Sequence, residues 1–160
     1  MANVSESLLD QRLGTLEAAR TWSPRVISKL EGHIRSSDDA GLFRINPVKF
    51  AVDKHIGEAE AIDLFLHGTA QGLFETDWLL LCPLCPCVVE TFRSLRSVRN
   101  RYHCSMCHGD YEAVLDEYVA VTFTVSEAVR AIGFHRPGEL PVADYCFRYK
   151  VLEGGLLPDG

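Results

Sequence analysis

Five of the six cysteines lie within residues 80–112. Two pairs, Cys82 with Cys85 and Cys104 with Cys107, share the spacing C-x2-C, and eighteen residues separate the pairs. Two intervening residues allow both thiols of a pair to face a shared ion at about 2.3 Å, and two such pairs complete a tetrahedron. The spacing therefore predicts a structural Zn²⁺ site with these four cysteines as ligands.

Other uses of the same thiols remain open from the sequence. Iron takes the same four thiolates, so spacing alone does not separate it from zinc. The "CPLC" pair is also typical of a redox dithiol, whose lowered thiol pKa usually needs a helix N-terminus. Here it follows an apolar stretch expected to be extended, and a second pair matches it, which favours metal over redox chemistry.

Three further residues near the pairs have less defined roles. Cys87 can replace Cys85 as a ligand, with the spacing C-x4-C, but the matched pairs favour leaving it out as a small apolar residue. His103 and His108 flank the second pair and are expected outside a site that four thiolates already fill. Cys146 lies far along the chain and is expected in the core.

A four-thiolate site has no open coordination position for water, so it offers no Lewis-acid chemistry. The sequence also lacks a G-x-S-x-G elbow, a P-loop and an H-E-x-x-H motif. We therefore expect the chain not to be an enzyme.

Four arginines, Arg93, Arg96, Arg99 and Arg101, crowd the linker between the cysteine pairs. One interpretation is a phosphate-contacting patch. The favoured one is charge balance, because four thiolates on one dication leave a net charge near −2, together with a solvated turn.

Helices are expected ahead of the cysteines. Residues 5–20 carry leucines at helical spacing, and Ser23-Pro24 provides a cap and a first-turn proline for a second helix with apolar residues on one face. Asn46-Pro47 repeats this start for a short helix to about Lys54.

After Gly57, a longer helix is expected over residues 58–71, with Ala61, Ile62, Phe65, Leu66 and Thr69 facing inward and Gly72 ending it. Helix, tight turn, helix and strand is the order of a winged helix. Because the second helix opens with acidic residues, we expect this unit to serve packing rather than DNA binding.

Strands are expected from the cysteine segment onward. Residues 88–92 and 101–103 predict a zinc ribbon connected by residues 93–100, and residues 118–125 and 146–155 predict further strands. The predicted fold is α+β, with a helical winged-helix-like N-terminal half followed by a zinc ribbon and short antiparallel strands. Its expected segments are N-terminal helices (1–40), a winged-helix-like unit (41–81), the zinc ribbon (82–112) and a strand-rich segment (113–160). Pro158-Asp159-Gly160 is a turn signal that no strand follows, so we expect either that the natural protein continues or that this edge needs a partner.

Composition narrows the class of protein. A hydrophobic fraction of 47% supports a real core, and a net charge of −6 argues against a general nucleic-acid binder. The first residues show no apolar leader, and no apolar run is long enough to cross a bilayer. We expect a cytoplasmic protein without membrane insertion, whose thiols stay reduced rather than forming disulfides.

Several stretches together resemble a known family: "TWSPRVISKLE", "FRINPVKFA", "EAIDLFLHGTAQGLFETDWLLLCPLC", "CSMC" and "VAVTFTVSEAVR". They resemble the uncharacterised N-terminal region ahead of the catalytic domain in certain bacterial class III adenylate/guanylate cyclases. The resemblance covers the chain from about Trp22 to its end, and Cys87 departs from it. It implies a regulatory or assembly module of cyclic-nucleotide signalling that contacts a downstream or separate cyclase domain.

Overall fold

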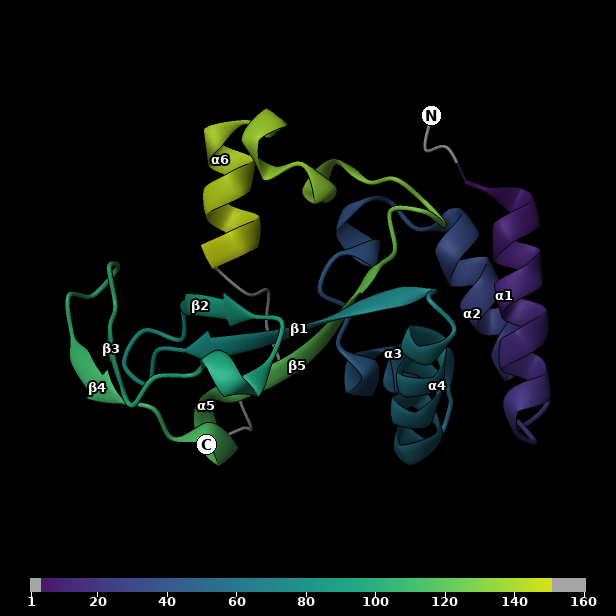
Figure 1. The fold of residues 1–160 in the computed structure, drawn as a ribbon, viewed down its shortest axis with the longest axis horizontal. Helices are drawn as coiled ribbons and strands as arrows, with labels where there is room; N and C mark the ends of the chain where they lie inside the picture. The colour runs from purple at the N-terminus through teal and green to yellow at the C-terminus, as the bar shows by residue number, and fades with distance from the viewer. Residues whose placement is uncertain (1–3, 151–160) are drawn as a thin grey trace. The chain divides into compact units, whose positions relative to one another are not determined.

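A computed structural model describes residues 4–150, apart from the side chains of residues 115 and 116, and shows an α+β fold (Figure 1). The helices are α1 (Glu6–Ala19), α2 (Val26–Ser36), α3 (Pro47–Lys54), α4 (Glu58–Ala70), α5 (Leu115–Tyr118) and α6 (Val142–Tyr145). The strands are β1 (Phe74–Leu81), β2 (Val88–Phe92), β3 (Arg101–His103), β4 (Asp110–Glu112) and β5 (Val119–Val125).

The described chain divides into two compact units. Unit 1 comprises residues 4–76 and 123–139, and unit 2 comprises residues 77–122 and 140–150. The division falls within β1 and at Thr122 of β5.

The two N-terminal helices lie close to their expected places. α1 buries Leu9, Leu13 and Leu16, which recur at helical spacing. α2 begins at Val26 and not at the expected proline, because Arg25 adopts a left-handed conformation with φ 68°. The expected Ser23 cap is therefore wrong; the Ser23 N–H instead donates to Glu60 Oε1 at 2.7 Å.

The short helix α3 starts as the sequence predicts. The Asn46 side chain accepts hydrogen bonds from the N–H groups of Val48 and Lys49, and Pro47 occupies the first turn. α3, a short turn, α4 and β1 follow in the expected order.

Phe65 of α4 lies at the centre of an aromatic core in unit 1. Its ring is 4.9–5.2 Å, centroid to centroid, from those of Phe50, Phe74 and Phe123. Ala61 and Phe65 point inward as predicted, but Leu66 is 52% exposed and Leu64 is buried in its place. Helical periodicity predicted a buried face that includes Leu66, whereas the face buried in the structure is rotated to include Leu64.

The strands around the cysteines pair differently from the predicted ribbon. β2 pairs antiparallel with β1, and β3 pairs antiparallel with β4. β2 belongs to a three-stranded sheet with the order β2-β1-β5, and β3 belongs to a two-stranded sheet with β4 (Figure 1). β2 and β3 therefore do not pair with each other as the predicted ribbon requires. The residues of both strands were predicted correctly; their partners were not.

The C-terminal part contains β5 as predicted, but the second expected strand is wrong within the described residues. α6 runs directly into a π-helical turn, Cys146–Lys150, and Cys146 is exposed rather than in the core. The remainder of that predicted strand and the turn signal at Pro158 lie outside the described residues. Among the residues from 4 to 150, no helix is both long and apolar enough to cross a membrane.

Candidate metal centre

Each cysteine pair occupies the turn of one β-hairpin. Cys82 and Cys85 lie between β1 and β2, and Cys104 and Cys107 lie between β3 and β4. We call residues 82–87 the first knuckle and residues 104–109 the second knuckle.

The two knuckles close in the same way. The N–H of Cys82 donates to the carbonyl of Cys87 at 2.9 Å, and the N–H of Cys104 donates to the carbonyl of Gly109 at 2.9 Å. Both bonds span five residues. Two turns distant in sequence therefore share the same closing backbone hydrogen bond.

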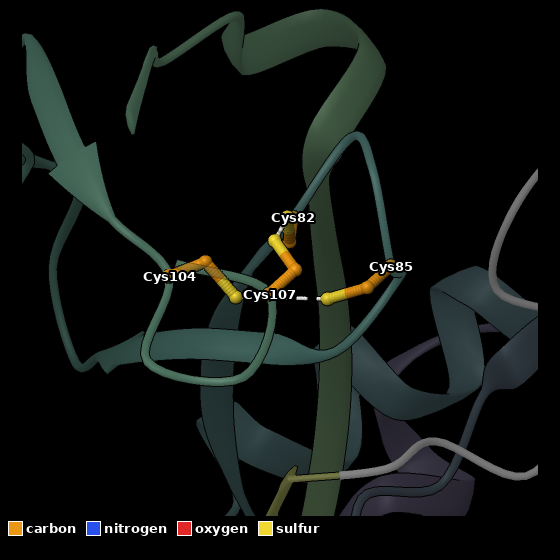
Figure 2. A group of neighbouring side chains, drawn as sticks. All are labelled: Cys82, Cys85, Cys104 and Cys107. Atoms are coloured by element: carbon orange, nitrogen blue, oxygen red, sulfur yellow. Dashed lines mark hydrogen bonds between the residues drawn. The ribbon is translucent and has the colours of Figure 1, made fainter. Parts of the chain in front are cut away.

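The four thiols meet across the knuckles (Figure 2). The Sγ atoms of Cys82 and Cys107 are 3.6 Å apart, as are those of Cys85 and Cys104, and all four sulfurs lie within 4.8 Å of one another. A tetrahedron with metal–sulfur bonds of about 2.3 Å has sulfurs about 3.8 Å apart. A disulfide would need about 2.05 Å, and all four cysteines are free. The four cysteines named from the sequence thus form one group with the dimensions of a metal site.

Backbone N–H groups surround the sulfurs in a repeated arrangement that the spacing alone did not reveal. The N–H of Leu84 donates to Sγ of Cys82 at 3.4 Å. The backbone two positions further on also lowers the pKa of each other thiol: Cys87 acts on Cys85, Met106 on Cys104 and Gly109 on Cys107. Such donors orient metal-bound thiolates and stabilise their charge.

The thiols differ in acidity. Burial raises the pKa of Cys104, but the N–H groups of Cys107 and Met106 outweigh it and lower that pKa to about 7. Burial raises the pKa of Cys85, and the thiols of Cys104 and Cys82 raise it further. A metal that binds four thiolates must therefore displace the protons that the metal-free group still holds.

The other candidate ligands lie outside the group. Cys87 is half-buried in the first knuckle, where its backbone acts to lower the pKa of the Cys85 thiol. His103 contacts Asp110 through Nδ1 at 3.0 Å, and its ring centroid is 6.1 Å from that of His108. Neither histidine belongs to a potential metal-binding group within the described residues.

The packing of the two knuckles explains why residue 109 is a glycine. A Cβ at Gly109 would lie 2.8 Å from Cδ1 of Leu84 and 3.5 Å from Sγ of Cys107. The first knuckle therefore packs its leucine on the second knuckle where the latter has no side chain.

A comparison with known protein families matches residues 8–158 to a family of unknown function, DUF5939. The chain belongs to the DUF5939 family. No curated protein and no solved structure matches this DUF5939 chain. The cysteine group lies inside the matched residues, so a potential metal centre is part of the family region in this chain.

Four thiolates can fill the coordination sphere of a tetrahedral ion and leave no position for a substrate. In this DUF5939 chain, the group can therefore join two hairpins that share no strand pairing.

Proposed function

We propose that this chain is a non-catalytic, zinc-binding regulatory or assembly module associated with a nucleotide cyclase. The meeting of four thiols from two equally built hairpin turns carries the metal part of the proposal. Zinc suits the site because it accepts four thiolates in a tetrahedron, and a cytoplasmic location would keep the thiols reduced.

The cyclase part rests on the resemblance of the quoted stretches, which extend from the second helix through both knuckles to β5. Such a module acts through protein–protein contacts with a downstream or separate cyclase domain. The zinc would hold the two hairpins in one arrangement, and the cyclase chemistry would reside elsewhere.

Elemental analysis of the purified chain tests the metal. We expect one zinc per chain and a loss of unit 2 structure when a strong chelator is added, because the binding free energy of such a site is folding free energy. Bound iron, seen as a coloured sample, would support the redox alternative. A metal-free chain whose melting ignores the chelator would contradict the zinc proposal.

A matched pair of variants strengthens that test. Cys104→Ser removes one of the four ligands and should abolish stoichiometric zinc, whereas Cys87→Ser should retain it. Loss of zinc in both variants would show that Cys87 is a ligand, as expected if it replaces Cys85.

Two observations test the cyclase association. We expect the coding sequence downstream of Gly160, or a neighbouring gene, to encode a cyclase catalytic domain. We also expect the purified chain to form no cyclic nucleotide by itself, but to change the rate of that catalytic domain when both are combined. Turnover by the chain alone would overturn the non-catalytic assignment.

A second candidate, a DNA-binding regulator, is favoured by the order α3, turn, α4 and β1, which matches a winged helix. Against it, α4 opens with Glu58 and Glu60 in its first turn, where DNA phosphates would meet like charge. Binding to duplex DNA that falls steeply with salt would support this candidate. The absence of binding at low salt would remove it.

A further inference from the structure

The connection between β2 and β3, residues 93–100, is the most basic stretch of unit 2, and we call it the arginine loop. Arg93, Arg96 and Arg99 recur at every third position, and no acidic residue occurs between Glu90 and Asp110. All three arginines are exposed. Asp77 Oδ1 lies 3.4 Å from Arg93 Nε, but Arg96 and Arg99 form no ion pair with any side chain that the structure describes.

The loop backbone is fixed by local hydrogen bonds. Leu95–Ser97 forms a 3₁₀ turn in which the Ser94 side chain accepts from the N–H of Arg96. The N–H of Val98 donates to the carbonyl of Leu95 at 3.2 Å. The arginine side chains are therefore presented from an ordered turn.

The end of the loop is anchored to the core of unit 2. Val98 packs against the buried cluster of Leu80, Phe92 and Tyr102. The Tyr102 hydroxyl accepts a hydrogen bond from the N–H of Arg99. A loop held in this way loses little conformational entropy when a partner binds.

The loop also exposes an apolar side chain. Leu95, next to Arg96, is 42% exposed. Guanidinium groups pair with carboxylates or phosphates, but a phosphate backbone would leave the leucine uncovered. The loop has no aromatic residue on which a base can stack, and the net charge of −6 repels an extended polyanion beyond the loop.

We propose that the arginine loop is a docking surface for an acidic segment of a partner protein. Carboxylates of that segment pair with Arg96 and Arg99, and an apolar side chain covers Leu95. The inference rests on the proposed assembly function and specifies the surface and the chemistry of the partner.

Two labelled twelve-residue peptides test the docking surface on the zinc-loaded chain, one of Glu-Leu-Glu-Glu repeats and one of Glu-Ser-Glu-Glu repeats. We expect the leucine peptide to bind more tightly, and Leu95→Ser to remove that difference. Arg96→Glu should weaken binding about tenfold, since it replaces an attractive ion pair by a repulsive one. Lys49→Glu makes the same charge change on exposed α3 in unit 1 and should leave the affinity unchanged.

Three outcomes would overturn the docking proposal. The first is the absence of peptide binding at low salt. The second is an equal loss of peptide affinity in Arg96→Glu and Lys49→Glu. The third is that a twelve-base-pair duplex DNA binds more tightly than either peptide and that Leu95→Ser does not change the DNA affinity. The zinc content of each variant separates this failure from that of the proposed function. A chain without zinc contradicts the metal centre before any peptide is added, whereas a zinc-loaded chain that ignores the peptides contradicts the docking surface alone.

Discussion

Units 1 and 2 are stabilised by different means. Unit 1 surrounds Phe65 with three further aromatic rings and buries apolar faces of α1, α2 and α4. Among the described residues of unit 2, one small buried cluster contains Leu79, Leu81 and Val88, and another contains Leu80, Phe92 and Tyr102. The β3–β4 hairpin contributes only Tyr102 to these buried sets.

This difference indicates which unit would depend on a metal for its stability. A unit with a continuous apolar core gains its stability from burial, whereas two hairpins with little core of their own need a cross-link. The thiol group lies in the turns of these two hairpins. We therefore expect unit 1 to keep its structure without metal and unit 2 to lose it.

The two tryptophans report on the units separately. Trp22 belongs to unit 1, where its Nε1 donates to the carbonyl of Leu16 at 2.9 Å. Trp78 belongs to unit 2 and packs against the cluster of Leu80, Phe92 and Tyr102. The variants Trp78→Phe and Trp22→Phe leave one reporter each, and they are the background for the measurements below.

The largest expected effect comes from removal of a metal ligand. Cys104→Ser should remove most of the zinc-binding free energy, on the order of 10 kcal/mol for structural zinc sites. We expect the Trp78 signal to become that of an unfolded segment while the Trp22 transition in urea stays in place. A simultaneous collapse of both signals would show that the metal supports the whole chain.

A core truncation in unit 1 should produce the reverse pattern. Phe65→Ala should destabilise unit 1 by about 3–5 kcal/mol, because it removes a fully buried ring and leaves a cavity. The Trp22 transition should move to lower urea, and the zinc content should remain one per chain. Exposed Leu66→Ala, on the same helix, is the control and should shift the Trp22 transition little. Loss of zinc in Phe65→Ala would contradict the separation of the two units.

Removal of the N-cap of α3 should destabilise unit 1 less than Phe65→Ala does. Asn46→Ala removes the side-chain acceptor for the N–H groups of Val48 and Lys49 and should cost unit 1 about 1 kcal/mol. Asn46→Asp keeps an acceptor and should restore most of that loss. Equal urea midpoints for the two variants would argue against a capping role.

The smallest expected effect concerns pH. Burial lowers the pKa of His33 below its ordinary 6.5, although its contact with the carbonyl of Gly41 partly opposes this. Folding therefore disfavours the protonated ring, so this contribution to stability is present above pH 6.5 and is lost as pH falls from 6.5 toward the folded pKa. His33→Gln should flatten the pH dependence of the Trp22 urea midpoint between pH 7.5 and pH 5.5.

The matched control for the histidine is exposed His55. His55→Asn tolerates the left-handed backbone at this position, where φ is 51°. It should leave the pH dependence as it is in the parent chain. An unchanged profile in His33→Gln, or a flattened one in His55→Asn, would contradict the assignment to His33.

Several elements could be predicted because their signals are local. The Asn46-Pro47 start is an interaction between neighbours in sequence, and it lies where expected. The four thiols could be named because the geometry of a knuckle is set within a C-x2-C unit. The start of α2 could not be predicted, since Ser23-Pro24 is compatible with a helix cap and the left-handed Arg25 intervenes. The segment at Cys146 alternates like a strand, yet it is helical up to Lys150.

The sequence by itself determined the α+β class, the positions of α1, α3 and α4, and the four cysteines that come together. Only the tertiary structure decided that β2 pairs with β1 and β3 with β4, and that Leu64 rather than Leu66 enters the core. The physical reason is the range of the interactions. Periodicity, caps and knuckle spacing act over a few residues, whereas strand pairing and the choice of a buried face depend on what the rest of the chain places opposite them.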